Sequence, residues 1–192
     1  MSEFNFKTKP YDHQLKALRS AWDKKYFAYF MEMGTGKSKV LIDEMAGYYL
    51  RGKIGAALII APKGVYRNWE RGEIPTHLSD DVPYVVAAWR APSEMNKDDK
   101  KKLGDILEPN GKLRILLMNI EALSTAKGTK FATQFLHTSN TLMAIDESTT
   151  IKTPTASRTK NVLKLSNLAR FKRIMTGSPV TKNPLDIYAQ LE

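Results

Sequence analysis

The stretch from Tyr26 to Met45 constrains the fold of this chain more than any other segment. It starts with five apolar or aromatic residues, continues through Met-Glu-Met-Gly-Thr-Gly-Lys-Ser at residues 31–38, and then shows an apolar helical pattern. A strand, a glycine-containing loop that ends in Gly-Lys-Ser and a helix occur in this order around a bound phosphate. Gly-x-Gly-Lys-Ser alone also fits a lysine-bearing surface turn, but the flanking strand and helix favour a nucleotide-binding P-loop.

The residue types in this loop suit a bound triphosphate. Gly34 and Gly36 lack a Cβ atom, so the backbone can turn tightly and direct its N–H groups toward an anion. The following helix adds the positive end of its dipole. We expect Lys37 to reach the β- and γ-phosphates of ATP and the Ser38 hydroxyl to bind Mg²⁺. The general pattern begins with glycine, whereas this chain has Met31 there. The predicted nucleotide contacts of the loop are Met33, Gly34, Thr35, Gly36, Lys37 and Ser38.

Apolar strands and helical segments alternate along the rest of the chain. The run at 56–61 is continuously apolar, which is typical of a parallel strand that is covered on both faces. Residues 113–118, 141–145 and 171–175 are predicted to be further strands. The alternation predicts an α/β fold with a doubly wound, mainly parallel sheet flanked by helices. At 192 residues we expect one domain, with residues 1–10 as a polar arm.

The candidate site residues follow these strands, and ligands of such sheets bind beyond the carboxyl ends of the strands. Lys37, Pro62-Lys63, Asp146-Glu147 and Thr176 all fall there. Two adjacent acids often form only a solvated loop or cap a helix. Beside a P-loop, however, we expect Asp146 to hold Mg²⁺ and Glu147 to orient or deprotonate the attacking water. Lys37, Asp146 and Glu147 are therefore the predicted catalytic residues.

The charge of the chain is one-sided, with a net charge of +10. Residues 151–183 contain no Asp or Glu. Their basic side chains are Lys152, Arg158, Lys160, Lys164, Arg170, Lys172, Arg173 and Lys182. A surface of one sign attracts a polyanion and makes binding salt-dependent, although a solvated basic face explains the spacing equally well. Residues 90–110 carry both signs and predict an exposed helix or lid.

Other classes of protein are disfavoured by composition. The chain has no cysteine, which excludes disulfides and thiolate metal sites, and its three scattered histidines argue against a structural zinc site. The sequence contains no run of 18 or more apolar residues, so it predicts no membrane span. The first residues lack the apolar centre of a signal peptide.

The order of these motifs resembles the first RecA-like lobe of superfamily-two helicases and translocases, most closely the Swi/Snf-type DNA translocases. Residues 10–14 look like the Q motif of that family, which places Gln14 where adenine is read. Residues 32–38 are similar to motif I. Residues 58–63, followed by Asn68-Trp69, look like motif Ia, a nucleic-acid contact. Residues 146–152 resemble motif II and 175–180 resemble motif III, which links the nucleotide state to the nucleic acid. The nucleic-acid or coupling residues predicted in this way are Pro62, Lys63, Lys152, Arg158, Thr176, Gly177 and Ser178.

The chain departs from this family pattern at two places. The family more often has an acidic residue where Met31 stands, and Ala-His where Ser148-Thr149 stand. The second departure removes a histidine that the family resemblance associates with coupling between the two sites.

The resemblance implies an ATP-binding lobe of a DNA translocase or helicase that hydrolyses ATP with Mg²⁺ and moves along DNA. The DNA is expected to be duplex and contacted through its backbone, without sequence specificity. A second RecA-like lobe, with the arginine that stabilises the transferring phosphoryl group, is absent from this chain. We therefore expect an isolated monomeric lobe with weak or no activity. The location implied is intracellular: cytoplasmic in a prokaryote or virus, nuclear in a eukaryote, and not in a membrane.

Two alternatives stay open. An ATP-gated nucleic-acid-binding module without motor activity needs only one lobe and a basic face. A small-molecule P-loop kinase is weaker, because it leaves the Asp-Glu pair, the motif after Met175 and the basic tract unused.

Overall fold

The computed structural model describes residues 5–90, 94–147 and 157–177. Its six strands form one sheet in the order β1-β6-β5-β2-β4-β3, and every neighbouring pair is parallel. The strands are β1 (Tyr26–Phe30), β2 (Ala56–Ala61), β3 (Tyr84–Ala88), β4 (Leu113–Asn119), β5 (Thr141–Asp146) and β6 (Phe171–Thr176). The helices in these ranges are α1 (Asp12–Ala21), α2 (Lys37–Leu50), α3 (Tyr66–Asn68), the π-helical turn η1 (Trp69–Glu73), α4 (Ile74–His77), α5 (Lys97–Asp105), the 3₁₀ turn η3 (Ile120–Ser124), α6 (Ala126–Leu136) and α7 (Ser157–Ser166).

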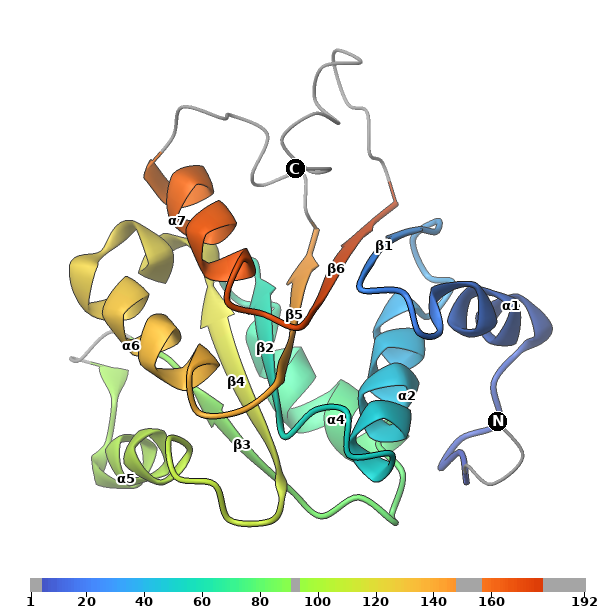
Figure 1. Cartoon of the computed structure of the whole chain (residues 1–192), viewed down its shortest axis with the longest axis horizontal. Coiled ribbons are helices and arrows are strands. Elements are labelled where there is room, and N and C mark those ends of the chain that lie inside the picture. Colours follow the sequence, from blue (N-terminus) through green and yellow to red (C-terminus); the bar gives the residue numbers. More distant parts are fainter. Residues whose placement is uncertain (1–4, 91–93, 148–156, 178–192) are drawn as a thin grey trace.

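Helices cover both faces of the sheet (Figure 1). One core gathers apolar side chains of α1, α2 and the run from α3 to α4, and a second core gathers those of α5, α6 and α7. Strand β2 contributes to both, with Ala57 and Ile59 in the first core and Leu58 and Ile60 in the second. Burial on both faces explains the continuous apolar run at residues 56–61. The predicted doubly wound α/β fold is confirmed, and the sheet is parallel throughout.

Two helical segments differ in how well the sequence foretold them. The mixed-charge region contains α5, in which only Leu103 is buried, and this fits the predicted exposed helix. Helix α7 was not predicted, because its polar residues show little apolar periodicity. The sequence also predicts a helix near the C-terminus that carries Leu185, Ile187, Tyr188 and Leu191, and these residues lie outside the described ranges. Among the described helices, none is long and apolar enough to cross a membrane.

The segment that enters α1 is packed against the domain from residue 5 onward. The Lys7 ammonium pairs with Asp80 at 2.7 Å, and the Thr8 hydroxyl lies 2.7 Å from Nδ1 of His77 at the end of α4. Phe6 packs on the first core, and Lys39 lies over its ring. The described part of the predicted polar arm, residues 5–10, therefore packs against the domain.

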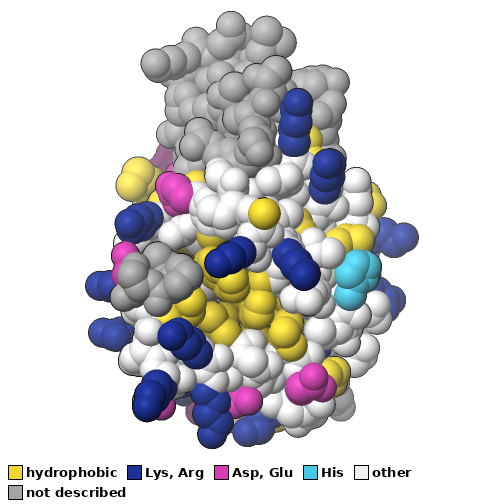
Figure 2. Space-filling view, turned by 90° about the vertical axis from the view of Figure 1, so that its left-hand side faces the viewer, with side chains coloured by type: hydrophobic (Ala, Val, Ile, Leu, Met, Phe, Trp, Pro, Cys, Tyr) yellow, Lys and Arg dark blue, Asp and Glu magenta, His cyan; other side chains and the backbone are white. Residues whose placement is uncertain are grey.

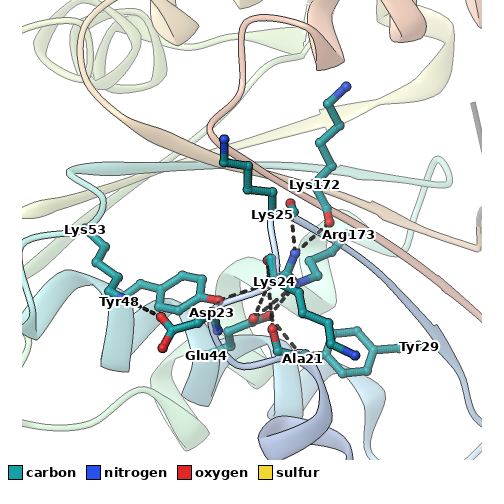
Figure 3. A network of polar contacts seen from close by, with 10 residues as sticks. All are labelled: Ala21, Asp23, Lys24, Lys25, Tyr29, Glu44, Tyr48, Lys53, Lys172 and Arg173. Atoms are coloured by element: carbon teal, nitrogen blue, oxygen red, sulfur yellow. Dashed lines mark hydrogen bonds and ion pairs between the residues drawn. The ribbon is translucent and has the colours of Figure 1, made fainter.

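Arg173 of β6 lies at the centre of a buried polar network (Figure 3). Its Nε donates to both carboxylate oxygens of Glu44, at 3.0 and 2.8 Å, and its Nη2 donates to the Tyr48 hydroxyl at 3.1 Å. The Tyr29 hydroxyl donates to Glu44 at 3.0 Å. The guanidinium also donates to the backbone carbonyls of Ala21, Lys24, Lys25 and Lys172. The network joins β6 and β1 to the second turn of α2, so it fixes these three elements relative to one another.

The basic tract of residues 151–183 divides between surface and interior in its described part. Lys160, Lys164 and Arg170 are exposed. Figure 2 shows the side of the molecule on which α5, α6 and α7 lie in Figure 1, where most charged side chains are Lys or Arg. Arg173, in contrast, is only 1% exposed. Arg173 therefore adds no charge to a polyanion-binding surface, because its charge is paired with Glu44 inside the core.

Candidate nucleotide-binding site

The loop between β1 and α2 depends on two glycines in the left-handed region, with φ of 78° at Gly34 and 80° at Gly36. A side chain at either position would strain the backbone. At Gly34 a Cβ atom would meet nothing within 4 Å, so this part of the loop leaves room for a ligand. At Gly36 a Cβ atom would lie 2.3 Å from Nε2 of Gln14, so the Gln14 side chain would have to move. Gly36 is also the residue from which α2 begins.

Lys37, the first residue of α2, folds back over this loop. Its ammonium donates to the backbone carbonyls of Met31 at 3.0 Å and Glu32 at 3.1 Å. Because Met31 uses its carbonyl here, its side chain is not needed for this contact, and the departure from glycine at this position leaves the contact intact. Met33 is 83% exposed, so its side chain projects out of the loop. Ser38 is half-buried as the second residue of α2.

Gln14 is buried and holds both the loop and its own helix. Its Nε2 donates to the Thr35 carbonyl at 3.0 Å, and its Oε1 accepts from the Tyr11 backbone N–H at 3.0 Å. His13 also contacts the Thr35 carbonyl, with Nε2 at 3.0 Å. An amide group offers two N–H donors and two lone pairs, so each end of Gln14 keeps one further hydrogen bond available. Tyr11, which is 71% exposed, stacks on His13 beside the loop.

The strand register brings the acid pair to the same edge of the sheet as the P-loop. Phe30, the last residue of β1, lies opposite Thr176 at the tip of β6. Asp146, the last residue of β5, lies opposite Met175 on the other side of β6. One strand therefore separates the P-loop from the two acids. The expectation that Lys37 and Asp146 lie close enough to share a triphosphate is consistent with this register.

The Asp146 carboxylate is buried, with 8% exposure, and is held by a tryptophan. Nε1 of Trp69 donates to its Oδ2 at 2.9 Å. Burial raises the pKa of Asp146, while the Trp69 hydrogen bond, a hydrogen bond with the Glu147 backbone and the positive charge of Lys37 oppose this rise. Glu147 has φ of 52°, a left-handed conformation that is costly for a residue with a Cβ and is often found at functional sites.

The tip of β6 touches the P-loop directly. The Met31 N–H donates to the Thr176 carbonyl at 3.3 Å, and Thr176 is fully buried. A Cβ atom on Gly177 would lie 3.2 Å from the Met33 nitrogen and 3.4 Å from the Met31 carbonyl oxygen. A change at this strand tip would therefore be felt by the loop. The predicted coupling residue Ser178 lies outside the described residues.

The remaining predicted nucleic-acid residues are placed only in part. Pro62 and Lys63 follow β2, whose neighbour is β5, so they lie at the same edge as Asp146. Lys63 is exposed, whereas Pro62 is half-buried. Lys152 lies outside the described residues, and for Arg158 only the backbone, within α7, is described.

Trp69 is the site residue whose role the sequence did not reveal. The family resemblance grouped it with Asn68 as a nucleic-acid contact. Asn68 is exposed, but Trp69 is 1% exposed and faces Asp146, so a direct nucleic-acid contact by Trp69 is wrong. The only sequence signal was the i, i+3 spacing of Tyr66 and Trp69, which indicates a buried helix face.

The donor set of the site fits Mg²⁺. This ion is bound in proteins through one or two carboxylates together with substrate phosphate oxygens. Asp146 offers a buried carboxylate and Ser38 a hydroxyl at the start of α2. In the part of the chain that is described, no three His, Cys, Asp or Glu side chains gather to hold a metal by themselves. Ser38 and Asp146 would share such a cation with the oxygens of a bound phosphate.

An all-parallel α/β sheet with a P-loop between its first strand and the following helix defines the class of P-loop nucleotide-binding lobes. A sequence profile of the SNF2-related domain matches residues 15–192, so the chain belongs to the SNF2-related domain family.

Individual relatives agree with this assignment. ATP-dependent helicase FUN30 of Saccharomyces cerevisiae is 26% identical over 163 residues, which are 84% of this chain and 13% of that protein. The Sulfolobus solfataricus SWI2/SNF2 ATPase core in complex with dsDNA superposes with a TM-score of 0.73 at 19% identity, covering 100% of this chain and 36% of that one. The UvsW helicase of bacteriophage T4 gives a TM-score of 0.66 at 17% identity, covering 96% and 58%. The chain thus spans less than two thirds of each of these relatives.

Proposed function

We propose that this chain is the ATP-binding lobe of a DNA translocase that hydrolyses ATP and moves along duplex DNA without sequence specificity. The observation that carries the proposal is the strand register, which puts the P-loop and the Asp146-Glu147 pair at one edge with only β6 between them. Membership of the SNF2-related family supports ATP as the nucleotide. A P-loop kinase for a small molecule would leave this paired arrangement without a use.

Each site residue has a role in this proposal. The N–H groups around Gly34 and Gly36 cradle the phosphates, and Lys37 exchanges its two carbonyl partners for the β- and γ-phosphate oxygens. Ser38 and Asp146 hold Mg²⁺, which neutralises charge on the phosphates when it is bound. Gln14 directs its remaining donor and acceptor to the edge of adenine.

Hydrolysis in this site is mainly a matter of position and charge. Glu147 lies next to the metal-binding carboxylate and orients or deprotonates the water that attacks the γ-phosphate. The contact of Gly177 with the backbone of Met31 and Met33 supports a second role, in which the tip of β6 reports the state of the phosphates to the residues that follow it. No covalent intermediate is required.

DNA as the partner is supported by three separate observations. The chain carries a net charge of +10, which favours a polyanion. Its exposed Lys63 lies at the carboxyl edge of the sheet, and α7 carries exposed lysines. The similar Sulfolobus solfataricus ATPase core is described in complex with dsDNA. Contacts to phosphate carry no sequence information, so binding is expected to be non-specific.

The motor needs a second RecA-like lobe, which would supply the arginine for the transferring phosphoryl group. The small share of each relative that this chain covers supports this part of the proposal. Such an arginine raises turnover by about 10³ to 10⁵-fold, so this lobe alone is expected to be a monomer that binds ATP and hydrolyses it slowly. The proposed location is intracellular.

The test is ATP hydrolysis by this chain and by a longer protein that includes the second lobe, each with and without duplex DNA. DNA-stimulated hydrolysis in the longer protein only, which weakens as salt rises, supports the motor. The absence of stimulation in both proteins, with DNA binding that still depends on ATP, would instead identify an ATP-gated binding module.

A further inference from the structure

The hydrogen bond between Trp69 and Asp146 joins two buried side chains that are 77 residues apart in sequence. The donor is the only N–H of the indole, and the acceptor is one of two oxygens of the carboxylate. Trp69 is 1% exposed and Asp146 8% exposed, so water does not compete strongly for either group. A hydrogen bond to a charged acceptor in such surroundings is stronger than a neutral one.

The segment that follows Trp69 is anchored to other parts of the domain. Trp69 begins the π-helical turn η1, and Pro75 follows in α4, where its missing N–H interrupts the regular helical bonding. The next residue, Glu70, pairs with Arg90 at 2.7 Å, and Arg90 also contacts Asp99 of α5 at 3.2 Å. Helical turns of this wide type occur often at functional sites. The indole therefore reaches Asp146 from a backbone segment whose next residue is held by an ion pair.

We propose that Trp69 is a positioning residue for the cation site: its indole N–H holds Oδ2 of Asp146 and so restrains the carboxylate that would bind Mg²⁺. This inference rests on the proposed function of Asp146 as the metal-binding carboxylate. A neutral donor suits the role, because it fixes the carboxylate without placing a positive charge beside the cation. Partners of this kind around a metal ligand typically change metal affinity about 10 to 100-fold when they are removed.

The contact gives Trp69 a role beyond core packing, because it restrains the carboxylate of Asp146 through a specific hydrogen bond. A tryptophan that only filled the core would have no effect that depends on Mg²⁺.

The experiment measures the affinity of this chain for a fluorescent ADP derivative with and without Mg²⁺. Trp69→Phe keeps an aromatic ring in the core and removes the N–H. The expected result is an unchanged affinity without Mg²⁺ and a gain from Mg²⁺ that is smaller by about tenfold. Trp89→Phe is the matched control, since Trp89 stacks on Phe131 in the other core, and it should keep the full gain.

A reference variant separates the two proposals. Asp146→Asn should lose the gain from Mg²⁺ altogether. If Asp146→Asn keeps the gain, the metal-binding role of Asp146 fails. If Asp146→Asn loses it but Trp69→Phe keeps it in full, the positioning role of Trp69 is overturned while the function of Asp146 stands.

A measurement on the unchanged chain covers the case in which Trp69→Phe does not fold. The chain has three tryptophans, and the indole N–H signal of Trp69 in an NMR spectrum is the one retained in both Trp22→Phe and Trp89→Phe. That signal should shift when Mg²⁺ is added to the ADP-bound protein, more than it does when ADP is added alone. A Trp69 signal that does not respond to Mg²⁺ would contradict the proposal.

Discussion

Arg173 and Glu44 form an ion pair in which both side chains are fully buried. The pair connects β6, whose tip touches the P-loop, to the second turn of the helix that the P-loop begins. The two residues lie 129 positions apart in sequence. The contact therefore holds the last described strand against a helix that lies early in the chain. Replacing both partners of a buried ion pair by apolar residues often costs little stability. Removing one partner costs much more, because the other charge then stays buried without compensation.

Arg173→Leu should destabilise the fold by about 3 to 5 kcal/mol, since the Glu44 carboxylate then stays buried without its cation. The double variant Arg173→Leu with Glu44→Leu should recover much of this loss. Urea unfolding of the two variants measures the difference. Lys172→Ala, a half-buried neighbour on β6, is the control and should cost about 1 kcal/mol or less. Equal losses in the single and double variants would contradict this account of the pair.

Glu147→Gln should keep ATP affinity within about twofold and lower turnover by at least about 100-fold, because the amide retains the shape of the side chain but cannot accept a proton. Lys37→Ala should lower turnover as well, through the loss of charge at the phosphates. Both variants are best measured in the longer protein with DNA present. If Glu147→Gln abolished nucleotide binding, Glu147 would not be the residue that activates water.

Gly36→Ala should cost more than Gly34→Ala, although both force a Cβ into a left-handed backbone at about 1 to 2 kcal/mol. Only at Gly36 does the new atom collide with Gln14. In a Gln14→Ala background the extra cost of Gly36→Ala should therefore fall by about 1 kcal/mol. Unfolding free energies of the natural chain, Gly36→Ala, Gln14→Ala and the double variant give the coupling. Additive effects would mean that Gln14 does not press on the loop.

The raised pKa of Asp43 leads us to expect that the free energy of unfolding depends on pH. Burial raises its pKa from 3.8 to about 6, partly opposed by Lys39, which pairs with it at 2.7 Å. The folded protein thus holds the proton more tightly than the unfolded chain. The contribution to stability is fully present below about pH 4 and is lost as the pH rises through about 6.

The comparison variant is Asp43→Asn, which cannot titrate. The stability of the natural chain relative to this variant should increase by up to about 3 kcal/mol between pH 7 and pH 4, since each pKa unit corresponds to about 1.4 kcal/mol. Urea unfolding at four or five pH values measures the difference. A difference that stays constant over this range would show that Asp43 has an ordinary pKa.

The features that sequence predicted well are those that depend on local pattern. The strands around Leu58 and Leu116 read as apolar runs because both faces of the sheet are covered. The glycines at positions 34 and 36 correctly predicted a tight loop before a helix. The edge at which Asp146 lies followed from the rule that parallel strands present their carboxyl ends together.

The features that sequence missed depend on partners far along the chain. Nothing near Arg173 indicates that its partner is Glu44, and its neighbours made it look like part of a basic surface. The indole of Trp69 finds Asp146 only after β2 and β5 pair. Helix α7 was not predicted from the sequence, because the segment is mostly polar and only Val162 and Leu165 pack into the core.

The pairing of β1 with β6 has a consequence for the order of folding. In the described sheet, the first strand in sequence has the last strand as its neighbour, so an emerging chain cannot complete the P-loop edge until Phe171–Thr176 has left the ribosome. Contacts this distant along the chain form slowly. Until these contacts form, the aromatic strand Tyr26–Phe30 exposes apolar side chains and an unpaired edge, which chaperones or other chains can bind. The edge that carries the P-loop is thus among the last parts of the described sheet to be completed during synthesis.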